Sequence, residues 1–81
     1  MLVKANQVFE VTTEATVASL DKKKVMPGGV IKTLSHPSKG EDGDKILATY
    51  VGKGRPGEAP NGKKFWVKVD ALARTGKLLQ K

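Results

Sequence analysis

Cysteine is absent from this 81-residue chain. Its absence excludes disulfides, thiolate zinc sites and thiol nucleophiles together. Small secreted domains usually depend on such cross-links, so we expect an intracellular, cytoplasmic protein. No apolar run approaches the roughly 18 residues that span a bilayer. Lys4 interrupts the apolar N-terminal residues at once, unlike a signal peptide, and we predict no membrane partner.

Residues suited to catalysis or metal binding are also scarce. The single histidine, His36, stands without a catalytic partner in a polar stretch. Glu41, Asp42 and Asp44 lack the ligand spacing and flanking helices of an EF-hand loop. The glycine-rich run 52–62 leads into an expected strand instead of a helix, so it does not match nucleotide-binding fingerprints. The sequence therefore predicts a binding protein, not an enzyme, with no metal or cofactor.

Acidic residues are few in the second half of the chain. Residues 1–44 carry six lysines and six carboxylates, whereas residues 45–81 carry nine cations and two carboxylates, so the whole net charge of +7 lies there. Clustered positive charge attracts polyanions such as nucleic acid, or an acidic protein surface. Thirteen of the 15 cations are lysine, which favours phosphate contacts over base-edge recognition. A lysine-coated surface that only maintains solubility would have the same composition.

Alternation of apolar and polar residues, with many β-branched side chains, predicts strands joined by polar turns. The expected strands are a long one at 7–20 that contains a bulge or bend, then 30–34, 45–51, 61–70 and a closing strand at 77–81. The connecting segments are a polar connector at 21–24, a turn at 26–29, and exposed loops at 35–44 and 52–62. A helix over 16–24 is an alternative. Residues 70–74 form a helical turn capped by Asp70, or part of a single helix over 69–79.

The stretch Asn61–Asp70 contains the one tryptophan of a chain with only four aromatic residues. In a strand, Phe65 shares one face with two valines, and Trp66 shares the other with Lys64 and Lys68. Trp66 would then be an exposed aromatic between two cations. A register shifted by one residue would instead bury Trp66 and expose Phe65.

This order of elements resembles the SH3-like small barrel. The resemblance covers nearly the whole chain and rests on the turn Pro27–Gly29, the strand Lys45–Val51, and Phe65–Val69 followed by a short turn and a closing strand. It implies a single mainly β domain over residues 1–81, a five-stranded SH3-like barrel with one short helical turn near the C-terminus. The Ala-Leu-Tyr-Asp-Tyr type segment of peptide-binding SH3 domains is absent, so recognition of proline-rich peptides is not implied.

The resemblance also bears on function. A tetrameric plasmid-borne dihydrofolate reductase is a barrel of this kind, but its active pore uses a Gln-Ile-Tyr stretch where this chain has Phe65-Trp66-Val67. Similar small barrels occur in ribosomal and transcription-associated proteins that bind nucleic acid. That likeness is an analogy of fold, from which function does not follow by itself.

The sequence thus predicts a nucleic-acid-binding module, mainly phosphate-contacting and weakly sequence-specific, in a small regulatory or phage-type protein. The partner would be DNA or RNA. The predicted binding residues are Lys53, Arg55, Lys63, Lys64, Trp66, Lys68 and Arg74. The alternative is a protein-interaction module that docks on an acidic partner or forms a homo-oligomer, with Trp66 and Tyr50 as interface anchors.

Overall fold

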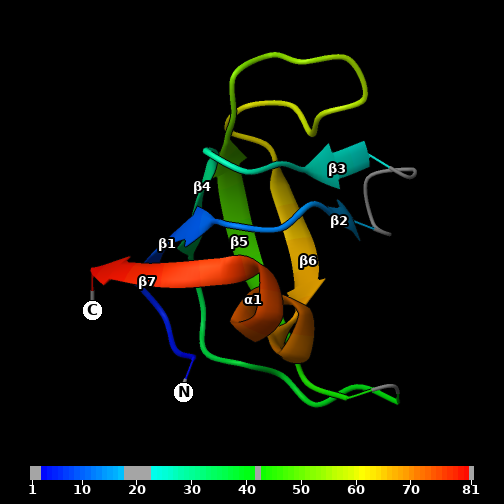
Figure 1. Cartoon of the computed structure of the whole chain (residues 1–81). Helices are drawn as coiled ribbons and strands as arrows, with labels where there is room; N and C mark the ends of the chain where they lie inside the picture. Colours follow the sequence, from blue (N-terminus) through cyan, green and yellow to red (C-terminus); the bar gives the residue numbers. More distant parts are fainter. Residues whose placement is uncertain (1–2, 18–22, 42, 81) are drawn as a thin grey trace.

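The computed structural model describes residues 3–17, 23–41 and 43–80, and these form a mainly β fold with one short helix (Figure 1). The elements, in chain order, are β1 (Val8–Val11), β2 (Ala15–Val17), β3 (Lys23–Val25), β4 (Val30–Thr33), β5 (Lys45–Val51), β6 (Lys64–Lys68), α1 (Val69–Thr75) and β7 (Gly76–Gln80). The predicted mainly β class is therefore confirmed.

The strands form two sheets. An antiparallel five-stranded sheet has the order β6-β5-β4-β1-β7, and β2 pairs with β3 in a separate hairpin (Figure 1). The predicted barrel closure is wrong, because β6 and β7 end the five-strand order without pairing to each other. The strands predicted at 7–20, 30–34, 45–51 and 61–70 correspond to β1, β4, β5 and β6, which are neighbours in turn in this sheet. The first strand, β1, lies between β4 and β7, so strands from the two ends of the chain are neighbours.

The long N-terminal strand expected at 7–20 is broken after Val11. The Val11 N–H donates to Gly29 O at 2.8 Å, and the Thr12 N–H donates to Thr75 O. These bonds turn the chain out of the five-stranded sheet before β2 begins, so the predicted bend is confirmed. Residues 18–22 lie outside the described residues, and the two ends of the alternative helix over 16–24 are strands, in β2 and β3, so that helix is wrong. Of the expected connector 21–24, Lys23 and Lys24 are instead part of β3.

The core lies between the two sheets. It contains twelve buried apolar side chains, among the described residues: Val3, Phe9, Val11, Val17, Val25, Ile31, Ile46, Ala48, Tyr50, Ala59, Phe65 and Leu72. Residues that are directly paired across strands lie on the same face of a sheet. Ile31 is paired with Phe9 on one side and with Tyr50 on the other, so these three side chains share the core face. Tyr50 is 0% exposed, so its expected role as an interface anchor is wrong.

The C-terminal helical turn is present but longer than predicted. α1 comprises seven residues and continues directly into β7, at the opposite end of the molecule from loop 52–62 (Figure 1). Lys68 occupies the N-cap position without a side-chain cap bond, so the predicted cap by Asp70 is wrong. Asp70 lies in the first turn, where its negative charge interacts favourably with the helix dipole. Leu72, on the inner side of the helix, is fully buried in the core.

Candidate nucleic-acid interface

Strand β6 presents Trp66 outward and Phe65 inward, as the alternation predicts. Phe65 is 2% exposed, whereas Trp66 is 41% exposed and lies between the exposed Lys64 and Lys68. The register with β5 pairs Phe65 with the buried Ala48, and this pairing commits the Phe65 side of β6 to the core. The alternative in which Trp66 is the core residue is therefore wrong.

Neighbouring strands add two lysines that sequence reasoning did not select. Lys45 begins β5 opposite Lys68, and its Nζ lies 5.2 Å from the centroid of the Trp66 ring. Lys32 of β4 is paired with Thr49, which is paired in turn with Lys64, so all three share the outer face. We call this surface the lysine–tryptophan face and define it by Lys32, Lys45, Lys64, Trp66 and Lys68.

The signal for Lys32 and Lys45 was present but incomplete. Alternation within each strand places both side chains away from the core, yet only the pairing of strands brings them beside Trp66. Lys32 also belongs to the half of the sequence whose net charge is zero. A search for locally clustered charge therefore could not find it.

The lysines of this face are weakly compensated. The ion pairs of the described residues are Lys24 with Glu14 at 2.9 Å and Arg55 with Glu58 at 2.8 Å, neither of which involves the face. In the described part of the chain, two acidic side chains lie at its margins. Glu41 lines a hollow with Lys45 and Lys68, and Glu10 of β1, which is paired with Val30, is exposed on the same side of the sheet. Lys45 and Lys68 are also directly opposite each other, an arrangement of like charges that destabilises a strand pair.

The remaining predicted residues do not gather on this face. Lys63 is exposed just before β6, and Lys53 extends its ammonium group over Gly28. Arg55 donates from Nη2 to Glu58 Oε2 at 2.8 Å, and this bond raises its pKa. Its guanidinium is therefore occupied in holding loop 52–62. Arg74 lies at the opposite end of the molecule, near the end of α1.

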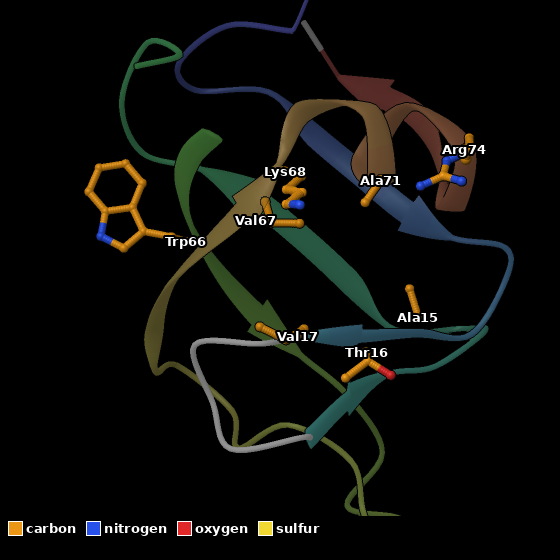
Figure 2. Close-up of a pocket in the computed structure, with 8 residues that line it drawn as sticks. All are labelled: Ala15, Thr16, Val17, Trp66, Val67, Lys68, Ala71 and Arg74. Carbon is orange, nitrogen blue, oxygen red and sulfur yellow. The ribbon is translucent and has the colours of Figure 1, made fainter. Parts of the chain in front are cut away.

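Arg74 instead lines a groove between β2, β6 and α1 (Figure 2). The groove has a volume of about 380 Å³ and is lined by Ala15, Thr16, Val17, Trp66, Val67, Lys68, Ala71 and Arg74. Figure 2 shows the Trp66 indole projecting from the opposite side of β6, so the groove is bordered by the backbone of that residue. Lys68 thus lies where the groove meets the lysine–tryptophan face.

Loop 52–62 is anchored through a buried carboxylate. Glu58 accepts hydrogen bonds from the backbone N–H groups of Lys53 and Arg55 and from the hydroxyl of Tyr50. The hydrogen bond from the Arg55 guanidinium, followed by that from Tyr50, lowers the Glu58 pKa to about 2. The described part of the loop is irregular, as predicted, but these bonds tie its two halves together. Lys53 and Arg55 therefore belong to an anchored loop.

Within the described residues, no group of three or more His, Cys, Asp or Glu side chains is arranged to hold a metal ion. His36 is exposed in the polar loop 35–44. The same part of the chain contains no helix with the length and apolar character needed to cross a membrane.

Comparisons with known proteins found no relatives. No protein-family model matches the chain, and neither the curated proteins nor the solved structures contain a match. The proposals below therefore stand on the geometry and charge of this chain.

Proposed function

We propose that this protein binds nucleic acid through the lysine–tryptophan face, chiefly by contacts to phosphate. The observation that carries the proposal is the gathering of three lysines from two strands around the half-exposed Trp66, with Lys32 one strand further along the sheet. Lysines contact phosphates without reading sequence, and an exposed aromatic ring can stack on any base. Binding would therefore be salt-dependent and weakly sequence-specific.

A structural role for these lysines accounts for only part of the pattern. Strand β6 is an edge strand, and lysine on an edge discourages pairing with other chains. Lys64 and Lys68 satisfy that explanation. Lys32 and Lys45, however, lie on β4 and β5, which have strands on both sides. Edge protection does not require a cation there, and this supports a binding role for the face.

We also propose that the fold is an open relative of the SH3-like barrel. The support is the strand order, in which three consecutive strands follow the turn at Pro27–Gly29 and a short helix precedes the last strand. The two unpaired ends of the five-stranded sheet are the departure from a closed barrel. The absence of cysteine supports a cytoplasmic site of action, which cell fractionation would test.

A matched pair of charge reversals tests the nucleic-acid proposal. Lys64→Glu with Lys68→Glu alters the face, whereas Lys4→Glu with Lys23→Glu makes the same change of net charge at exposed positions elsewhere. Binding to labelled DNA and RNA is measured by fluorescence anisotropy at low and moderate salt. The first variant should lose at least about tenfold in affinity and the control much less, because two phosphate contacts become repulsive. Equal losses, or no binding by the natural chain at low salt, would contradict the proposal.

A protein partner is the second candidate. The outer face of the same sheet also carries Val51, which is 55% exposed and is paired with the half-buried Val30. An acidic protein or a second copy could cover this apolar and basic surface. Size-exclusion chromatography with light scattering tests self-association, and affinity capture after nuclease treatment tests for an acidic protein. A monomer that retains only nucleic acid would exclude this candidate.

A further inference from the structure

The groove between β2, β6 and α1 is a second feature of the surface, next to the lysine–tryptophan face but turned away from it (Figure 2). Its lining includes four apolar side chains: Ala15, Val17, Val67 and Ala71. Ala15, Val67 and Ala71 are half-buried, and Val17 is buried. All four present small or branched aliphatic groups to the groove. A volume of about 380 Å³ lies within the range of small-molecule sites, about 300–1,000 Å³.

The charges at the groove favour an anionic occupant. Lys68 and Arg74 line it from β6 and from α1, and no carboxylate belongs to the described residues that form its lining. Thr16 adds a hydroxyl that can donate or accept a hydrogen bond. An apolar slot between two cations suits a flat ring with apolar faces that is attached to phosphate. A nucleotide has that chemistry.

We propose that this groove receives one unpaired base of a single-stranded nucleic acid, an inference that rests on the nucleic-acid function proposed above. β6 separates the groove from the Trp66 indole (Figure 2). A strand that crosses β6 near Lys68 places one base on the indole and a neighbouring base in the groove. Lys68 then contacts the intervening phosphate, and Arg74 contacts the phosphate beyond the groove.

This path distinguishes single strands from duplexes. Bases in a duplex are stacked and paired, so none can enter the groove unless it is unstacked first. A duplex can still contact the lysines of the outer face through its phosphates. The groove therefore predicts a preference for single strands, whereas the face alone predicts only affinity for polyanions.

Filling the groove tests the inference in the full chain. Ala71→Leu adds bulk to a lining residue on α1, and Ala73→Leu makes the same change at an exposed position of that helix outside the groove. The probes are a short labelled single strand, its duplex, and a single strand with abasic sites. Ala71→Leu should weaken single-strand binding by about tenfold and leave duplex binding unchanged. Ala73→Leu should leave the binding of both the single strand and the duplex unchanged. The abasic strand should bind the natural chain about as weakly as the intact strand binds Ala71→Leu.

A second variant guards against misfolding. Arg74→Gln removes the cation of α1 at an exposed position. It should weaken binding of the single strand about threefold and have little effect on binding of the duplex. Equal affinity of the natural chain for single strand and duplex, or equal effects of the two leucine variants, would overturn the inference and leave the proposed function standing. Failure of every probe to bind at low salt would instead remove the proposed function itself.

Discussion

At the scale of single residues, Glu58 is the buried carboxylate of the described chain. It accepts hydrogen bonds from Tyr50, from the Arg55 guanidinium and from two backbone N–H groups. A buried charge is tolerated when it is paired and fully hydrogen-bonded. A side chain at Gly29 or Gly52 would collide with Tyr50 or Glu58, so these glycines are required by the network. The pair of Tyr50 and Glu58 thus accounts for two glycines and for the course of loop 52–62.

The pH dependence of stability follows from this carboxylate. The pKa of Glu58 falls from an ordinary value of 4.5 to about 2, chiefly through Arg55. A carboxylate with a lowered folded-state pKa contributes stability above the unfolded pKa and loses it as pH falls through the folded one. The free energy of unfolding of the natural chain should therefore decline between pH about 4.5 and 2. In Glu58→Gln it should be lower at neutral pH and decline less over that window.

Tyr50→Phe is the matched control for that experiment. It removes only the hydroxyl, which donates to Glu58 and accepts from the Met26 N–H, and it keeps the carboxylate with its Arg55 partner. We expect it to lower stability at neutral pH by about 1.5–3 kcal/mol, the usual loss for a hydrogen bond to a charged group. The decline at acid pH should become smaller but persist, because Arg55 still lowers the pKa of Glu58. Urea unfolding at several pH values measures both. Identical pH profiles for the natural chain and Glu58→Gln would contradict the assignment.

At the scale of elements, β6 connects every functional feature of the molecule. Its inner side chains join the core, its outer side chains form the lysine–tryptophan face, and its far edge borders the groove. It also leads without a loop into α1, which places Arg74 at the groove. Lys45 crosses from β5 to lie over the indole, a cation–π contact that restricts how the ring is oriented.

The single tryptophan makes β6 directly observable. We expect the emission of a partly exposed indole, quenching by acrylamide, and protection from acrylamide when an oligonucleotide is bound. Trp66→Ala should cost about 1–3 kcal/mol of binding free energy for a single strand, because one stacked base is lost. Val51→Ala, an exposed apolar residue on the same sheet face, should bind normally. Unchanged acrylamide quenching in the complex would exclude Trp66 from the interface.

At the scale of the whole molecule, the net charge of +7 is unevenly distributed over the surface. The lysines of the lysine–tryptophan face come from β4, β5 and β6, and Arg55 is neutralised by Glu58 at the opposite end from α1. The polyanion is therefore expected to meet one face of the five-stranded sheet and not the whole surface. This concentration of cations without ion-pair partners in the described residues sets the salt dependence.

The salt dependence can be stated as a slope. Four lysines on the face, each neutralising one phosphate, contribute about −3 to the slope of log affinity against log salt with a single strand, and a contact from Arg74 would add about −0.7. Lys32→Ala and Lys45→Ala should each reduce its magnitude by about 0.7. Lys4→Ala is the control and should leave it unchanged. A slope that does not respond to Lys32 or Lys45 would restrict the interface to β6.

Prediction from sequence succeeded where one strand decides the outcome. Residues 45–51 match β5, and the opposite directions of Phe65 and Trp66 follow from alternation confirmed by burial. It failed where distant segments meet. The break after Val11 depends on hydrogen bonds to Gly29 and Thr75, and the strand status of Lys23 and Lys24 depends on pairing with β2. The burial of Tyr50 likewise follows from the packing of two sheets.

By itself, the sequence determined the mainly β class, the opposite directions of Phe65 and Trp66, and the excess of lysine, because alternation and composition are local properties. Which of the two side chains faces the core was decided by the pairing of β6 with β5. The tertiary structure alone decided which lysines surround Trp66. Lys32 and Lys45 are distant from Trp66 in sequence, and strand register places them on the same face. Arg55 is instead ion-paired with the buried carboxylate of Glu58. It also decided that the sheets stay open and leave a groove beside β6, since closure depends on long-range pairing that no local pattern records.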